Sequence, residues 1–222
     1  MKLDVNNLPK YSKREEIINI ITHLIGFLFS IAVLIFFIIY NDLRNLKFTY
    51  MIPYFVYVFT MMIVFGVSSL YHASKFNSRA RGILRIIDHS DIYAFVFGTY
   101  LPLCLYGITN TPIMIAAIAL EAVFMIAAIV LNVVPSDSNI IKVIAYIIYM
   151  IDGWLMIFFY PFNIGMEFNV FLFILLGGVV YSIGAITYAI GKKRKYFHSL
   201  FHIFVVLGAI TQFIGILLLL IK

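Results

Sequence analysis

Seven long apolar stretches in succession limit what this chain can fold into more than any other feature of its sequence. Each stretch has about 20 residues or more, the length that an α-helix needs to cross a bilayer. Only helices and closed barrels satisfy the backbone in lipid, and the alternation of barrel strands is missing. The sequence therefore predicts an all-α, polytopic membrane protein with seven transmembrane helices. The predicted spans are residues 17–40, 50–72, 86–106, 113–134, 140–160, 168–190 and 197–221.

The composition supports this class and excludes others. Of the 222 residues, 64% are hydrophobic and only 12% are charged, whereas soluble domains have about 25% charged residues. A soluble enzyme fold and nucleic-acid binding are therefore poor interpretations. The first stretch is too long for a signal peptide. We expect a cytoplasmic tail over residues 1–16 and a single membrane domain over residues 17–222.

The basic residues predict the orientation of the chain. With the N-terminus in the cytoplasm and the C-terminus outside, the outer segments hold only Arg44, Lys47 and Lys222 of the 16 Lys and Arg residues. Short cytoplasmic loops carry an excess of Lys and Arg, so this orientation is strongly favoured. The remaining basic residues then lie on the cytoplasmic side: Lys2, Lys10, Lys13, Arg14, Lys75, Arg79, Arg81, Arg85, Lys142, Lys192, Lys193, Arg194 and Lys195.

Several ionisable side chains fall at the cytoplasmic ends of the predicted helices. His72 ends the second span, Asp88 and His89 begin the third, and His198 and His202 begin the seventh. Ionisable groups at membrane depth are costly, so they are candidates for function. Segments that are far apart in the sequence therefore converge at one depth.

The spacing of these residues suggests a metal site. His198 and His202 are separated by four residues and share one helix face, and His72 supplies a third imidazole. Three protein ligands leave a position for water, as in catalytic zinc sites, and the nearby carboxylate of Asp88 or Asp91 can hold that water or take its proton. Histidines at a membrane interface also contact headgroups or loops, so spacing alone leaves both interpretations open.

The ordered motifs of the chain resemble those of one family. Ser68 and His72 form an S-x-x-x-H motif, and His198 and His202 form an H-x-x-x-H block. These motifs resemble the hemolysin III family, the bacterial branch of the progestin and adipoQ (adiponectin) receptor superfamily. Further segments that fit this resemblance are Glu15–Asn19 with Thr22 and His23, Asp88–Tyr93, Gly98–Pro102, Gly153–Trp154 and Gly177–Ser182.

The resemblance implies a fold, a cofactor and roles for individual residues. It implies seven helices in the bacterial inner membrane and one zinc ion held by His72, His198 and His202. Asp88 would approach the zinc through water as a general base, and Ser68 would lie beside it as oxyanion support or in the surrounding shell. The receptor branch is associated with hydrolysis of lipid amides such as ceramide, and the bacterial branch with a cytolysin name and with membrane lipid homeostasis.

Other polar residues in the spans have less certain roles. Glu16, Asn19 and His23 lie on one face of the first helix, where they would surround the metal ligands or pack the bundle through hydrogen bonds. Asp91 lies about one turn from Asp88 and is a possible second acid. His89 follows Asp88 directly, so we expect it to point elsewhere and to pack at the interface.

Glu121 and Asp152 are the deepest charged residues. Each lies about 12 residues from the inner end of its span, or roughly 18 Å deep at 1.5 Å per residue. The one Lys or Arg in these two spans is Lys142, ten residues before Asp152. We expect them to be protonated or hydrogen-bonded in the bundle, and to line a cavity or support the structure rather than to take part in catalysis.

Two classes of function remain in competition. The first is a zinc-dependent hydrolase that cleaves an amide or ester bond of a lipid and contributes to lipid homeostasis. The second is a non-enzymatic sensor or modulator of the membrane, or a cytolysin, in which zinc has a structural role. Membrane lipids are the expected partners in both cases, whereas the sequence identifies no protein partner.

Overall fold

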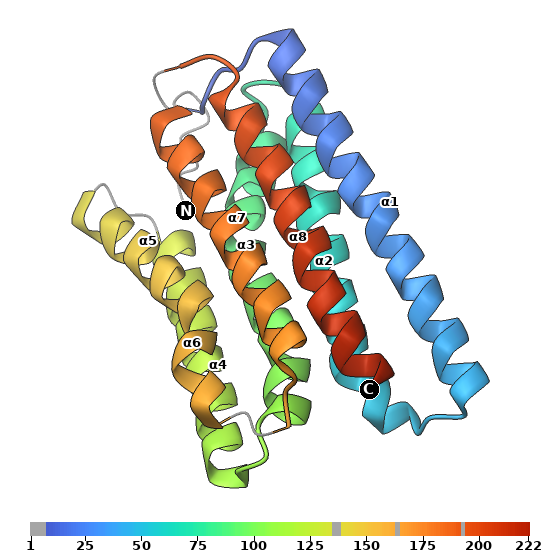
Figure 1. The fold of residues 1–222 in the computed structure, drawn as a ribbon. Coiled ribbons are helices and arrows are strands. Elements are labelled where there is room, and N and C mark those ends of the chain that lie inside the picture. The colour runs from blue at the N-terminus through green and yellow to red at the C-terminus, as the bar shows by residue number, and fades with distance from the viewer. Residues whose placement is uncertain (1–7, 135–138, 163–164, 192–193) are drawn as a thin grey trace.

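The computed structural model describes residues 8–134, 139–162, 165–191 and 194–222, and within these ranges it contains helices and no strand (Figure 1). Helix α7 packs along α8, α1 along α2, α2 along α3 and α3 along α4, and α1 also contacts α8. The elements are α1 (Lys13–Arg44), α2 (Phe48–Ala73), α3 (Arg79–Gly107), α4 (Thr111–Val133), α5 (Asn139–Trp154), α6 (Met156–Phe159), the 3₁₀ turn η2 (Tyr160–Phe162), α7 (Phe168–Gly191) and α8 (Phe197–Ile221).

The helices present apolar side chains outwards, as a membrane requires. Of the described helices, α1, α2, α4, α7 and α8 are each long and apolar enough to cross a bilayer. Many large hydrophobic residues on these helices are exposed, among them Leu28, Ile115 and Ile186. The prediction of an all-α polytopic membrane protein is confirmed. The count of seven spans and the orientation stay predictions, because α3 is more polar and α5 is short.

The helix predicted over residues 140–160 is interrupted. The backbone N–H of Leu155 donates to the carbonyl of Asp152, three residues back, which tightens the chain into a turn between α5 and α6. The N–H of Met156 then donates to the hydroxyl of Tyr100 on α3, at 2.9 Å. A buried N–H requires an acceptor, so a side chain on another helix stabilises a break that the apolar pattern does not reveal.

Capping residues set the starts of α1 and α3. Ser12 and Glu15 form a capping box, in which each side chain accepts from the other residue's backbone N–H. Ser78 accepts from the N–H of Arg81, so α3 begins at Arg79, seven residues before the predicted span. Ser, Thr, Asp and Asn stabilise helix starts in this way.

The early start of α3 places Asp88 and His89 in its third turn rather than at its first residues. One end of the bundle, which we name the histidine end, therefore collects the starts of α1, α3 and α8 and the last turn of α2 (Figure 1). Some of the sequence predictions lie outside the described residues: residues 1–7 of the predicted tail, the connection 135–138, and Lys192 and Lys193. The side chain of Lys142 also lies outside them.

Candidate metal centre

Three histidines from two helices meet at the histidine end. His72, in the last turn of α2, and His198 and His202, in the first two turns of α8, are all buried. One ring nitrogen from each lies within 4.8 Å of the others. The Nε2 atoms of His72 and His198 are 3.4 Å apart, and those of His198 and His202 are 3.0 Å apart. The three residues predicted as ligands therefore do come together.

The start of α1 holds α8 in the position that makes this possible. The carboxylate of Glu15 accepts from the backbone N–H of Tyr196 at 2.8 Å, just before α8 begins. Tyr196 itself has φ of 65°, a left-handed conformation that turns the chain into the helix. This contact therefore ties the start of α8, which carries His198 and His202, to the start of α1.

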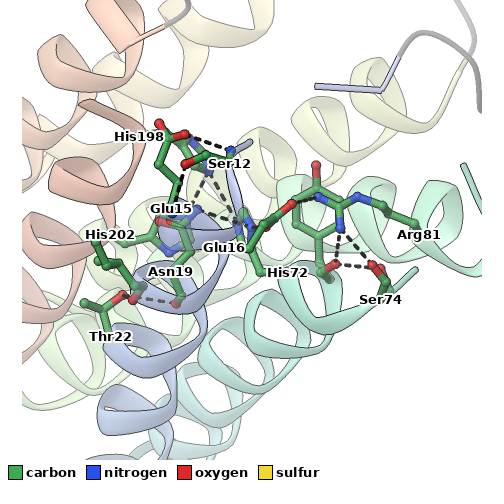
Figure 2. A network of polar contacts seen from close by, with 12 residues as sticks. Ser12, Glu15, Glu16, Asn19, Thr22, His72, Ser74, Arg81, His198 and His202 are labelled. Atoms are coloured by element: carbon green, nitrogen blue, oxygen red, sulfur yellow. Dashed lines mark hydrogen bonds and ion pairs between the residues drawn. The ribbon is translucent and has the colours of Figure 1, made fainter. Parts of the chain in front are cut away.

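A charged network fixes the ring of His72 (Figure 2). Its Nδ1 lies 2.6 Å from the carboxylate oxygen Oε2 of Glu16. The amide nitrogen of Asn19 lies 3.3 Å from the same ring nitrogen, but it is a donor, so it contacts the ring without accepting from it. A carboxylate can only accept, so Nδ1 carries the proton and donates to Glu16. The lone pair of Nε2 is then left to face the other two histidines.

Arg81 supports Glu16 from the other side. Its guanidinium pairs with Oε1 of Glu16 and donates to the carbonyl of Ser74 at 2.9 Å. The guanidinium also lies over the ring of Tyr71, at 4.8 Å from its centroid. Arg81 is 1% exposed, so its charge depends on this pairing. From its sequence position Arg81 was used only to predict the orientation of the chain, because a basic residue at a helix end usually faces water or headgroups.

The donor set fits a tetrahedral metal ion. Zinc binds imidazole nitrogens at 2.0–2.1 Å, which separates two nitrogens of a tetrahedral site by about 3.4 Å. The His72–His198 separation of 3.4 Å agrees with this value, the His198–His202 separation of 3.0 Å is somewhat shorter, and the three nitrogens all lie within 4.8 Å of one another. A carboxylate that accepts from the far nitrogen of a ligating histidine is a usual partner of such sites, and Glu16 occupies this position on His72.

Aromatic rings enclose the histidine group. The ring of Tyr11 stacks on that of His198, with centroids 4.5 Å apart and planes at 14°. The ring of His23 lies 3.9 Å from that of His202. Burial raises the pKa of the Tyr11 hydroxyl, with Tyr71 adding to the effect, so Tyr11 stays protonated. Nothing in the sequence pointed to Tyr11, since a tyrosine in a polar tail carries no signal of this contact.

The predicted acids of α3 differ in their surroundings. Asp88 lies near the group: its carboxylate interacts with Ser68 and with His72, and its Oδ2 lies 3.5 Å from Nδ1 of His89. His89 therefore contacts Asp88, contrary to the expectation that it points away. Asp91 is buried, and neither carboxyl oxygen has a hydrogen-bond partner among the described residues.

Glu121 and Asp152 form a second buried polar group. Each is 1% exposed, and their carboxyl groups lie close enough to interact with each other and with Tyr100. They belong to α4 and α5, which carry none of the three clustered histidines. The structure thus brings the two acids together, apart from the candidate metal ligands.

Comparisons with known proteins agree with the motifs. The family model described as "Haemolysin-III related" matches residues 11–213 of the chain. The chain is 31% identical over 211 residues to the hemolysin-3 homolog of Bacillus subtilis (strain 168), a match that covers 93% of this chain and 95% of that protein. It is also 31% identical over 205 residues to hemolysin-3 of Bacillus cereus, covering 92% and 91% respectively.

Proposed function

The chain belongs to the haemolysin-III related family of multi-pass membrane proteins, and on that premise we propose that its histidine group holds one zinc ion and hydrolyses an amide or ester bond of a membrane lipid. The observation that carries this proposal is the group of three buried imidazoles, with Glu16 on the far nitrogen of His72. Neutral imidazoles are ligands of zinc and also of copper, iron and nickel, so metal analysis has to identify the ion. When bound, zinc polarises a carbonyl and lowers the pKa of a bound water to about 7.

The residues around the ligands have separate roles in this proposal. Glu16 accepts from Nδ1 of His72 and so keeps the Nε2 lone pair directed at the other histidines. Asp88 accepts a proton from the attacking water and delivers it to the nitrogen or oxygen of the leaving group. Ser68, which interacts with Asp88, orients that carboxylate. The water oxygen thereby joins the carbonyl carbon, and the bond to the leaving group breaks.

The position of the group suggests the kind of substrate. The ligands lie in the last turn of α2 and the first turns of α8, so the reacting bond would lie near a membrane interface rather than at the bilayer centre. Lipid amides and esters have their carbonyl groups at that depth. In the predicted seven-span orientation this interface is the cytoplasmic one, and the activity would contribute to lipid homeostasis.

The test combines metal analysis with lipid turnover. Purified protein should contain about one zinc ion per chain and should hydrolyse a ceramide or a phospholipid, whereas a His198→Ala variant should lose both properties. Asp88→Asn should retain zinc and lose turnover. Asp42→Asn, which changes an exposed acid at the opposite end of α1, is the matched control. Full zinc occupancy without turnover of any lipid tested would refute the hydrolase.

A structural metal is the second candidate, because the ligands join α2 to α8. On that alternative, His72→Ala lowers the melting temperature and Asp88→Asn changes nothing. The names of the relatives also suggest cytolysis, which lysis of erythrocytes by the purified protein would test directly. A loss of lysis in the well-folded Asp88→Asn protein would favour the enzymatic role over both alternatives.

A further inference from the structure

A groove lies between the first turns of α1 and α8, outside the histidine group. The two helices begin at the same end of the bundle and contact each other (Figure 1). The groove has a volume of about 300 Å³, which reaches the lower limit of ligand pockets. It is lined by Ile18 of α1, by Lys195, and by Phe197, Ser199, Leu200 and Ile203 of α8.

The N-terminus of α8 opens into this groove without a cap. The N-cap residue Tyr196, which is left-handed, makes no side-chain hydrogen bond to the first turn. The first N–H groups of a helix lack partners within the helix and, with the helix dipole, favour an anion. This feature alone describes many helices and does not make a binding site.

Ser199 supplies the second, independent observation. Its residue is 3% exposed, and its hydroxyl has no hydrogen-bond partner among the described residues. Buried hydroxyls are normally satisfied, commonly by a backbone carbonyl one turn earlier in a helix. Ser199 lines the groove instead, so the groove contains an unused donor beside the uncapped helix start.

Basic side chains surround the same opening. Lys195 lines the groove and is exposed. The guanidinium carbon of Arg194 lies 5.9 Å from the ring centroid of Phe197, another lining residue. Glu15, the acid of the adjacent turn of α1, is buried and already accepts from the N–H groups of Ser12 and Tyr196. The two basic side chains outweigh the one carboxylate of Glu15, so the net charge around the opening favours an anion.

The rest of the groove is apolar and partly exposed. Leu200 is 37% exposed and Ile203 is 38% exposed, and Ile18 of α1 faces them. A free phosphate ion would gain nothing from these walls, whereas an acyl chain would cover them. An anionic headgroup joined to an acyl chain matches both parts of the groove.

We propose that this groove binds an anionic phospholipid, with the phosphate at the start of α8 beside Lys195 and Ser199 and one acyl chain along Ile18, Leu200 and Ile203. The lipid would contact the same turn of α8 that carries His198, and so would stabilise the position of that helix. The inference does not depend on zinc or on hydrolysis.

The test is lipid binding by the purified full-length protein in a nonionic detergent, measured by native mass spectrometry. Phosphatidylglycerol should bind more tightly than phosphatidylcholine with the same acyl chains. Arg194→Gln and Lys195→Gln each remove one positive charge, and each should weaken binding by about fivefold. Ser199→Ala should weaken binding by about tenfold. Lys75→Gln, an exposed lysine of another loop, is the charge control.

Filling the groove gives a second measurement. Leu200→Trp should prevent binding of phosphatidylglycerol, while Leu207→Trp, two turns further along α8 and outside the groove, should not. Equal binding of both lipids, unaffected by these variants, would overturn the inference. So would inorganic phosphate that displaces the lipid at equal concentration, or a Leu200→Trp variant that changes the oligomeric state instead. Zinc content in each preparation reports separately on the proposed function.

Discussion

Replacing Glu16 tests whether the network on His72 serves a metal site. Oε2 of Glu16 accepts from Nδ1 of His72 at 2.6 Å, and Oε1 pairs with Arg81. The side chains of His72 and Arg81 are 0% and 2% exposed, while that of Glu16 is 19% exposed. Glu16→Ala therefore removes the partner of two buried donors, and Glu16→Gln removes the charge but keeps an oxygen for His72.

The magnitude follows from the bonds that remain. A hydrogen bond to a charged group contributes about 1.5–3 kcal/mol, and two such bonds are lost in Glu16→Ala. Arg81 keeps the carbonyl of Ser74 at 2.9 Å, and Glu16 is partly solvated, so we expect a loss of about 2–4 kcal/mol of stability. For Glu16→Gln we expect about 1–2 kcal/mol. Zinc affinity should fall by about 10–100-fold in both variants, the usual effect of losing such a partner.

The assay is competition for zinc against a chelator of known affinity, with a melting curve of each metal-free protein. Glu15→Gln is the matched control: Glu15 is the neighbouring acid, but it bonds the backbone of Ser12 and Tyr196 rather than a histidine. The amide oxygen of Gln can still accept from Tyr196, so this variant should lower the melting temperature with little effect on zinc affinity. If Glu16→Gln bound zinc as tightly as the wild type, or Glu15→Gln lost zinc to the same degree, the assignment of Glu16 would be wrong.

Three further predictions concern the fold. Tyr100→Phe removes the acceptor of the Met156 N–H and should cost about 1–3 kcal/mol in thermal or denaturant unfolding; an unchanged midpoint would contradict the account of the α5–α6 break. Gly208→Ala places a Cβ 2.6 Å from a tyrosine ring of α7 and should destabilise the protein by about 1–3 kcal/mol, whereas Gly153→Ala, with nothing within 4 Å, should be tolerated. Lys75→Cys, in a chain whose single native cysteine is replaced by serine, should react with a membrane-impermeant maleimide only from the cytoplasmic side. Labelling of this cysteine in intact cells would show that the predicted orientation is wrong.

The sequence predicted the helices well because their signal is local. An apolar run of sufficient length must be helical in lipid, so the starts and ends of most elements follow from the positions of polar residues. The pair His198 and His202 was equally predictable, since four residues make one turn. His72 required the topology, which brings the end of α2 to the depth at which α8 begins.

The partners of these histidines were only partly predictable. The common face of Glu16, Asn19 and His23 was clear from their spacing, but two roles remained open for it. The structure places Glu16 on His72 and the ring of His23 beside that of His202. No sequence pattern pointed to Tyr11 or Arg81. Their contacts join segments that are far apart in the chain, and the local sequence of neither segment predicts that they meet.

The sequence alone determined the class of protein, its family and the three candidate ligands. Bilayer thickness sets the length of each spanning helix, and helical pitch sets the depth and the face of each residue on it. The ordered motifs indicate the family. The tertiary structure alone decided which side chains meet. Arg81 pairs with Glu16, the hydroxyl of Tyr100 accepts from the N–H of Met156, and the ring of Tyr11 stacks on that of His198. Hydrogen bonds and ring stacking act over a few ångströms, so they depend on how helices are rotated and shifted against one another. Apolar patterning in lipid constrains that rotation only weakly, because a membrane helix carries apolar side chains on its packed faces as well as on its lipid-facing ones.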